Sequence, residues 1–244
     1  MAERNAMREL SNSVCIVGVD ESDEIGTLFH KSQLALHLEA MTNAVRDAGL
    51  KITVASPGGV TPTVDPLSFN LAYNSNDAGK VKDQQDYLKR LGSVLTSPTR
   101  VEDIKADGFD IIFLVGGHGP MQDMAVHPTI GAVIVAMLDN PKKIVAAVCH
   151  GPAGLLTAAR SDGTWACKDR QLTGFSNDEE SQAGFAGNAP WLLEDRLRIS
   201  GGRYVAKAPW APHAVVDGNL VTGQQNYSAG VTADAVLKLV SVTA

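Results

Sequence analysis

Cys149 and His150 form the pair of neighbouring residues in this sequence with the clearest chemical potential. They follow the apolar run IVAAV at residues 144–148 and precede Gly151 and a proline, which predicts a sharp turn from a strand into a helix. A side chain at such a turn protrudes at the sheet edge, as in the nucleophile elbow, here with a thiol in place of a hydroxyl. The amides and dipole of the following helix are expected to favour the reactive thiolate. His150 is expected either to accept the thiol proton or, when charged, to lower the thiol pKa further. The alternative is that Cys149 is only a small buried side chain.

A glycine-rich turn, GGHGP at residues 116–120, follows another apolar run, DIIFLV. Glycines allow backbone amides to approach a ligand closely, and two amides beside a nucleophile form an oxyanion hole. We expect the amide of Gly117 and one amide of the Cys149–His150 turn to make this pair. His118 is expected either to line the pocket or to cap its own turn. The turn matches neither GxGxxG nor a P-loop, so no nucleotide binding is predicted.

The composition restricts the classes of partner. The chain has 244 residues, 44% of them hydrophobic and 20% charged, with a formal net charge of −6, so nucleic acid and anionic membranes are not expected partners. No apolar run approaches the ~20 residues that cross a bilayer, and the N-terminus lacks the apolar core of a secretory signal. Cys15, Cys149 and Cys167 are few and show no CxxC spacing, which argues against disulfides and structural zinc and for a reducing, cytoplasmic location. No metal or cofactor is predicted.

Strand-like apolar runs alternate with segments of helical period along the chain. This order predicts an α/β fold with a parallel sheet covered by helices, in which ligands bind beyond the carboxyl ends of the strands. Both turns described above fall at such ends. The predicted strands are residues 13–19, 51–55, 110–115, 144–148 and 219–222, and the predicted helices are residues 32–48, 80–91, 128–138 and 231–240, with another beginning over 153–159.

We predict a single domain over residues 12–244, preceded by an N-terminal extension at residues 1–11. The polar stretch around residues 62–98 is expected to be an insertion over one edge of the sheet or over the site. Residues 160–212, which contain all three tryptophans, carry hairpin and short-helix signals without a definite assignment.

Four motifs, GGHGP, VCHGP, LTGFSNDEE and LVTGQQNYSA, resemble in this order the PfpI/ThiJ superfamily, a branch of the class I glutamine-amidotransferase-like fold. Within it, the sequence is similar to the heat-shock chaperone and glyoxalase III group. The resemblance implies a flavodoxin-like three-layer sandwich, with a mostly parallel central sheet and helices on both faces, and a homodimer. It also implies a cysteine nucleophile, no cofactor, and activities that include conversion of methylglyoxal to lactate, deglycation, peptide hydrolysis and chaperoning.

The resemblance assigns roles to particular residues. Cys149 matches the family nucleophile and His150 the histidine that accompanies it. The third member is an acidic residue shortly after the TGF turn, for which Glu180 is the best match, with Asp178 and Glu179 close behind. A carboxylate there would orient His150 and set its tautomer. The alternative is that these acidic residues only favour the N-terminus of a helix through its dipole.

One position departs from the family pattern. Catalytic members carry a glutamate on the first helix that contacts the thiol and helps to move a proton. Counting back from Gly49 places His37 there, because Glu39 is offset by two positions and therefore by ~200° around a helix. A histidine can act as a base near neutral pH, or its presence can abolish the glyoxalase reaction. Alternatively, His37 is a partly exposed helix residue and the alignment is shifted by a turn.

The leading hypothesis is a cysteine-dependent enzyme that acts on small reactive carbonyl compounds, of the glyoxalase III or deglycase type, with a Cys-His-Glu arrangement. A second hypothesis is an amidase or peptidase that uses the same cysteine and histidine. A third is a non-enzymatic stress chaperone or redox sensor with an oxidisable Cys149, which is favoured if His37 replaces the family glutamate.

Overall fold

The computed structural model of the chain describes residues 13–17, 51–62, 69–71 and 76–242. The predicted helix over residues 32–48, with His37, and the predicted extension at residues 1–11 lie outside the described residues. The division into one domain with an insertion around residues 62–98 stays a prediction.

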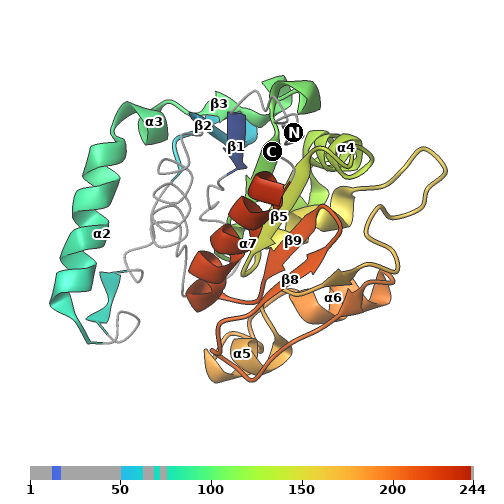
Figure 1. Ribbon diagram of the computed structural model, residues 1–244. Coiled ribbons are helices and arrows are strands. Elements are labelled where there is room, and N and C mark those ends of the chain that lie inside the picture. Colours follow the sequence, from blue (N-terminus) through green and yellow to red (C-terminus); the bar gives the residue numbers. More distant parts are fainter. Residues whose placement is uncertain (1–12, 18–50, 63–68, 72–75, 243–244) are drawn as a thin grey trace, which may run out of the picture.

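A seven-stranded sheet forms the centre of the fold, in the order β3-β2-β1-β4-β5-β9-β8 (Figure 1). All neighbouring pairs are parallel except β8 and β9, which are antiparallel. A separate two-stranded parallel sheet pairs β6 with β7. The strands are β1 Ser13–Val17, β2 Lys51–Ser56, β3 Thr99–Arg100, β4 Ile111–Leu114, β5 Ile144–Val148, β6 Gln171–Leu172, β7 Arg203–Tyr204, β8 Ala214–Asp217 and β9 Leu220–Gly223.

Helices flank this sheet. The C-terminal helix α7 packs against β5, β8 and β9 and crosses in front of them in Figure 1, whereas α4 packs against β5 and the segment that follows it. The α-helices are α2 Ala78–Leu91, α3 Ser93–Thr96, α4 Pro128–Leu138, α5 Asn177–Gln182, α6 Leu193–Ile199 and α7 Ala229–Val242. The predicted flavodoxin-like α/β class is confirmed, and β5 and α4 have the bounds that the sequence predicts.

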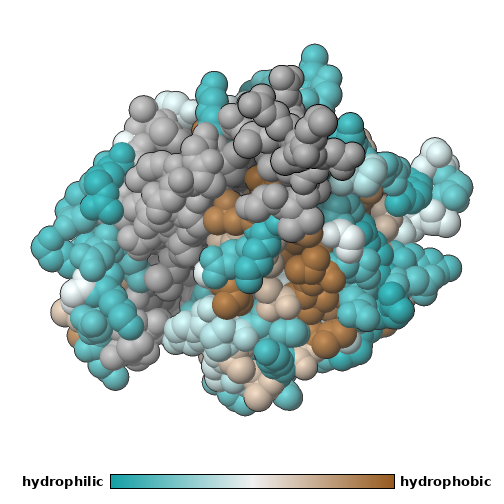
Figure 2. All heavy atoms as spheres, viewed as in Figure 1, coloured by the Kyte–Doolittle hydropathy of each residue, from teal (hydrophilic) through white to brown (hydrophobic). Residues whose placement is uncertain are grey.

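The core is built around β4 and β5. Every residue of both strands is buried, so these strands are apolar throughout, as expected for a parallel sheet covered by other elements. Each fully buried Ile, Leu or Phe side chain contributes roughly 1.5–3 kcal/mol. On the face in Figure 2, hydrophilic residues cover much of the coloured surface, and hydrophobic residues show near its middle. The two rigid strands therefore provide a fixed base for the turns at their carboxyl ends.

The segment after β5 differs from the prediction of an ordinary helix beginning over residues 153–159. It is a 3-10 helix, Gly151–Thr157. Its later carbonyl groups bind partners outside an α-helical pattern: the carbonyl of Leu155 accepts hydrogen bonds from the indole Nε1 of Trp165, at 2.6 Å, and from the amide of Ala158. A short helix of this kind contributes a weaker dipole at its start than a long α-helix would.

Among the described residues no single helix has the length and apolar character to cross a membrane. The successive helical segments Gly119–Val126 and Pro128–Leu138 reach that length together, but they meet at a bend of 76°.

Asn219, at the turn between β8 and β9, ties the sheet to the end of α4. Its Nδ2 lies 3.1–3.3 Å from four backbone carbonyl oxygens, and its Oδ1 accepts a hydrogen bond from Arg170. The four carbonyl groups belong to Met137, Leu138, Asn140 and Lys143. The side-chain nitrogen of Asn219 therefore contacts both the end of α4 and the loop between α4 and β5. These contacts fix where β5 begins.

We expect Asn219→Asp to lower the free energy of unfolding by about 2 kcal/mol, because a carboxylate keeps the bond to Arg170 but places charged oxygen against four carbonyl oxygens. Chemical denaturation measures the change. Asn140→Asp is the matched control, because Asn140 uses its side-chain oxygen only as an acceptor for the amide of Lys142. Equal losses of stability in the two variants would contradict this role of Asn219.

Candidate active site

Cys149 occupies a strained turn directly after β5. Its φ angle is 61°, in the left-handed region that residues with a side chain rarely adopt, at a cost of about 1–3 kcal/mol. Hydrogen bonds hold both sides of the residue: its amide donates to the carbonyl of Gly223, at 3.0 Å, and its carbonyl accepts from the amide of Phe175, at 2.9 Å. Gly151 completes the turn, since a Cβ atom there would lie 2.3 Å from the carbonyl oxygen of Leu114 on β4.

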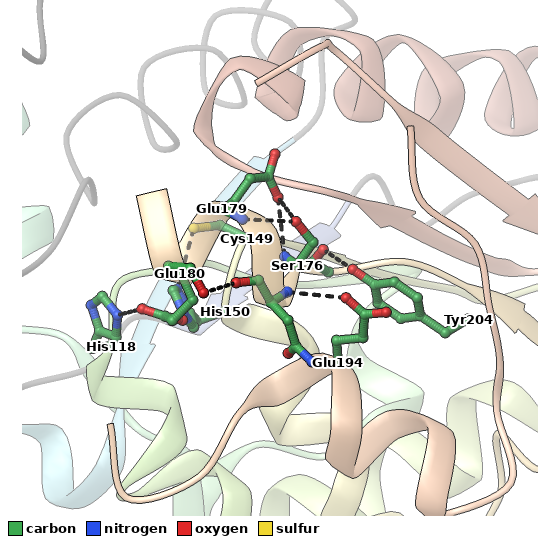
Figure 3. Close-up of polar contacts among 11 residues, drawn as sticks. His118, Cys149, His150, Ser176, Glu179, Glu180, Glu194 and Tyr204 are labelled. Carbon is green, nitrogen blue, oxygen red and sulfur yellow. Dashed lines mark hydrogen bonds and ion pairs between the residues drawn. The ribbon is translucent and has the colours of Figure 1, made fainter. Parts of the chain in front are cut away.

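Three side chains form a hydrogen-bonded line from this turn (Figure 3). The Sγ atom of Cys149 lies 3.5 Å from Nδ1 of His150, and Nε2 of His150 lies 2.7 Å from Oε2 of Glu180. An ionised carboxylate only accepts hydrogen bonds, so Nε2 of His150 carries the hydrogen. In neutral imidazole the other nitrogen is then an acceptor. Nδ1 of His150 therefore presents its lone pair to the thiol.

A second histidine binds the same carboxylate. Nε2 of His118 lies 2.7 Å from Oε1 of Glu180, and the rings of His118 and His150 have their centroids 4.1 Å apart. Phe175 stacks on His150 at 4.5 Å, and Phe185 meets His118 edge-on at 5.3 Å. The two histidines are thus held between aromatic rings, with Glu180 bridging their Nε2 atoms as Figure 3 shows.

Burial governs the protonation states in this cluster. It raises the pKa of the Cys149 thiol to about 12, although backbone hydrogen bonds from Gly117 and His150 oppose the shift and the carboxylate of Glu180 adds to it. Burial also lowers the pKa of His150 to about 4, together with the charge of His118. Burial alone would raise the pKa of Glu180, yet hydrogen bonds and charge interactions with the two histidines hold it well below its usual range.

The expectation that the turn favours the thiolate is therefore wrong for the resting state. Cys149 is only 4% exposed, and removing a thiolate from water costs more than two amides and a short helix return. At neutral pH the pair consists of a thiol and a neutral imidazole. The amides of Gly117 and His150 do face the sulfur, as the predicted oxyanion hole requires.

Glu179, the neighbour of Glu180, fixes the start of α5 and so directs Glu180 toward His150. Glu179 points the other way and accepts four hydrogen bonds of 2.8–3.0 Å. Two come from the amide and hydroxyl of Ser176, one from the amide of Trp210 and one from Nε2 of Gln224. Ser176 and Glu179 form a capping box at the start of α5, which satisfies the free amides of the helix and fixes its first turn.

Of the three acidic candidates near α5, Glu180 is the one that contacts His150. Asp178 is exposed, and Glu179 is fully engaged by its four donors. The alternative that these residues only favour a helix N-terminus is correct for their position, because all three lie in the first turn of α5. Glu180 combines both properties.

Several residues of the site were not predicted. Phe175 stacks on His150, and the ring of Trp210 meets that of Phe175 edge-on, with the two centroids 5.8 Å apart. Trp210 has a φ angle of 66°. The indole Nε1 of Trp210 donates to Gln182, at 2.7 Å. The capping-box pattern S-x-x-E was a usable signal for Ser176 and Glu179, whereas Trp210 lies in a stretch without periodic pattern.

The remaining predicted residues are placed as follows. Gly117, with a φ angle of 103°, and His118 follow β4, so their turn meets that of Cys149 at the same sheet edge. His37 lies outside the described residues. Cys167 is fully buried in the core.

Within the part of the chain that is described, His118, His150 and Glu180 form the group with a spacing suited to a metal ion. Both Nε2 atoms are already bound to the carboxylate oxygens at 2.7 Å. The two ring nitrogens and the two carboxylate oxygens thus satisfy one another, so that the three side chains form a hydrogen-bonded network.

Known proteins resemble this chain over most of its length. The family model described as "DJ-1/PfpI family" matches residues 13–238. Human glutamine amidotransferase-like class 1 domain-containing protein 1 is 32% identical over 209 residues, covering 85% of this chain and 86% of the human protein. The glutathione-independent glyoxalase HSP31 of Saccharomyces cerevisiae is 31% identical over 201 residues, covering 78% of this chain and 81% of the yeast protein.

Solved structures show the same fold. The Francisella tularensis Rapid Encystment Protein 24 KDa superposes with a TM-score of 0.81 at 26% identity, covering 93% of this chain and 98% of that one. Glyoxalase III of Candida albicans superposes with a TM-score of 0.80 at 22% identity, covering 93% and 96%. The extent of the family match, together with relatives more than 30% identical over most of the chain, leads to one conclusion: this chain belongs to the DJ-1/PfpI family.

Proposed function

We propose that this protein is a cysteine-dependent enzyme that converts small reactive carbonyl compounds, in the manner of a glutathione-independent glyoxalase, with deglycation as a related activity. The observation that carries the proposal is the line from Cys149 through His150 to Glu180, with its contacts of 3.5 and 2.7 Å. A relative 31% identical over 78% of the chain bears the name of glutathione-independent glyoxalase, which supports this class of activity.

In the first step, the sulfur of Cys149 attacks the aldehyde carbon of a 2-oxoaldehyde such as methylglyoxal. The thiol proton passes to Nδ1 of His150, a carbon–sulfur bond forms, and the electron pair of the carbonyl bond moves to its oxygen. Because the thiol has a raised pKa, proton transfer must accompany attack rather than precede it. The carboxylate of Glu180 stabilises the imidazolium that forms.

The charge that develops on the substrate oxygen needs donors at the same place. The backbone amides of Gly117 and His150 already face the sulfur, so an oxygen on the attacked carbon lies within their reach. Fixed donors of this kind stabilise a transition state without reorganisation. Return of the proton from His150 to this oxygen gives a neutral hemithioacetal.

The second step moves hydrogen within the substrate and consumes no external oxidant. A base takes the proton from the former aldehyde carbon while the neighbouring carbonyl oxygen gains a proton, which gives an enediol. Protonation of the carbon that bears the new hydroxyl, with loss of the proton from the other hydroxyl, then gives the thioester of a 2-hydroxy acid. Water then cleaves the carbon–sulfur bond, which releases the acid, lactate from methylglyoxal, and restores the thiol. We propose that this additional base lies near His37, which by its spacing from Gly49 takes the position of the family glutamate. His37 lies outside the described residues.

The burial of the site favours small substrates over polypeptides. Cys149 is 4% exposed and His150 is 1% exposed, so a two- or three-carbon aldehyde fits this surrounding more readily than an extended peptide. This ranks the amidase or peptidase hypothesis below the glyoxalase one. A homodimer, a reducing cytoplasmic setting and the chaperone or redox-sensor alternative stay predictions.

We expect Cys149→Ala to reduce lactate formation from methylglyoxal, measured without glutathione, by at least about a hundredfold, because no other group forms the carbon–sulfur bond. Cys167→Ala is the matched control: it removes a second buried cysteine that lies in the core. Activity that survives in the Cys149 variant, with Cys167→Ala unchanged, would rule out the proposed mechanism.

We expect Glu180→Gln to lower kcat at least about tenfold with a smaller effect on KM. An amide can donate to Nε2 of His150, which turns the Nδ1–H toward the thiol and removes the proton acceptor. Steady-state kinetics measures the effect. Asp178→Asn is the control, because Asp178 is an exposed neighbour on the same helical turn. Similar losses in the two variants would contradict the role of Glu180.

We expect no thiolate from Cys149 at neutral pH, because burial raises its pKa to about 12. The ultraviolet thiolate absorbance of the wild type, corrected with that of Cys149→Ala, should stay near zero at neutral and mildly alkaline pH. His150, with its pKa lowered to about 4, should remain a neutral base until the pH falls toward that value. A thiolate signal that is half developed below neutral pH would show that an ion pair, not a thiol, is the resting form.

A further inference from the structure

The proposed mechanism uses one histidine, yet two share the carboxylate of Glu180. We propose that His118 is a positioning residue that acts through Glu180: by sharing the carboxylate, it weakens the hold of His150 on a proton and so keeps His150 a neutral proton acceptor. The inference rests on the proposed function for the role of His150, and on the geometry alone for the coupling between the rings.

The contacts of Glu180 with the two histidines are symmetric. Each histidine binds a different oxygen of Glu180 through Nε2, both at 2.7 Å. The N–H of His118 draws on the charge that would otherwise stabilise a proton on His150. Since the ring centroids are only 4.1 Å apart, one carboxylate cannot balance two imidazolium ions at this distance without strong repulsion.

His150 is the more deeply buried of the two rings. The His118 side chain is 11% exposed, whereas that of His150 is 2% exposed. A charge on the more buried ring costs more. His150 therefore depends on Glu180 to hold a proton, and its pKa is lowered by burial first and by the neighbouring His118 next.

The other groups around His150 do not replace this effect. Its own turn contributes the thiol of Cys149, which is uncharged at neutral pH, and the residue after it is Gly151. From α5, Glu180 is the carboxylate in contact, while Glu179 is turned to its four donors. Phe175 covers one face of the ring. Among the described residues around His150, His118 is thus the one that competes with it for Glu180, in addition to the effect of burial.

The test is the titration of His150 itself, followed by nitrogen-15 and carbon-13 NMR of the imidazole signals in the full-length protein. The signal is assigned by its loss in His150→Gln. We expect the midpoint of His150 to rise by about one pH unit or more in His118→Leu, which removes the N–H group that binds Glu180. His118→Gln keeps an N–H donor and should raise the midpoint less.

His127→Gln is the matched control, because His127 binds Glu102, a carboxylate from another segment, at 3.2 Å; it should leave the His150 midpoint unchanged. A midpoint that stays at its wild-type value, or falls, in His118→Leu overturns the proposal. If the leucine variant does not fold, an unchanged or lowered midpoint in His118→Ala overturns it equally. The NMR titration does not require catalysis. Absence of lactate formation would therefore contradict the proposed function, whereas the His150 midpoint alone decides this inference. Where lactate does form, the acidic limb of its pH profile should move upward with the midpoint.

Discussion

The carboxylate of Glu180 holds the candidate site together, because it fixes two histidines that come from different strands of the sheet. Its oxygens lie 2.7 Å from Nε2 of His118, after β4, and of His150, after β5. That geometry depends on the first turn of α5, which the capping box of Ser176 and Glu179 locks in place. Glu179 extends the support to the loop of Trp210. The loss of this one orientation would leave a buried thiol without a defined proton acceptor.

A second constraint is the burial of Cys149. The strained turn places the sulfur beside two backbone amides, yet the dry surroundings keep it a thiol. In the proposed mechanism such a site gains reactivity when a substrate arrives, since proton transfer to His150 and carbon–sulfur bond formation occur together. It is also protected from unselective oxidants, because the thiolate is the form that they attack. This arrangement suits the role proposed for Cys149, whose thiol must stay reduced until it reacts with a small electrophile.

The sequence predicted the strand β5 and the helix α4 well. It predicted contacts between distant segments and the protonation state of Cys149 poorly. Apolar runs bounded by turn residues located β5 and α4, because burial and helix-start signals are local. Glu180 was found through the resemblance, since no local rule separates it from Glu179. The 3-10 helix at Gly151–Thr157 and the edge-on contact of Trp210 with Phe175 depend on contacts between distant segments. The preference for the thiol was missed because the depth of burial is not readable from a motif.

The central claim is that Glu180 fixes His150 as the tautomer with hydrogen on Nε2 and a lone pair on Nδ1 directed at Cys149. Nitrogen-15 chemical shifts of the two ring nitrogens at neutral pH measure this directly. The structure predicts a protonated, pyrrole-type Nε2 and an unprotonated, pyridine-type Nδ1 for His150. A protonated Nδ1, in the opposite tautomer or in an imidazolium, would contradict the account, because His150 could then not accept the proton of the thiol.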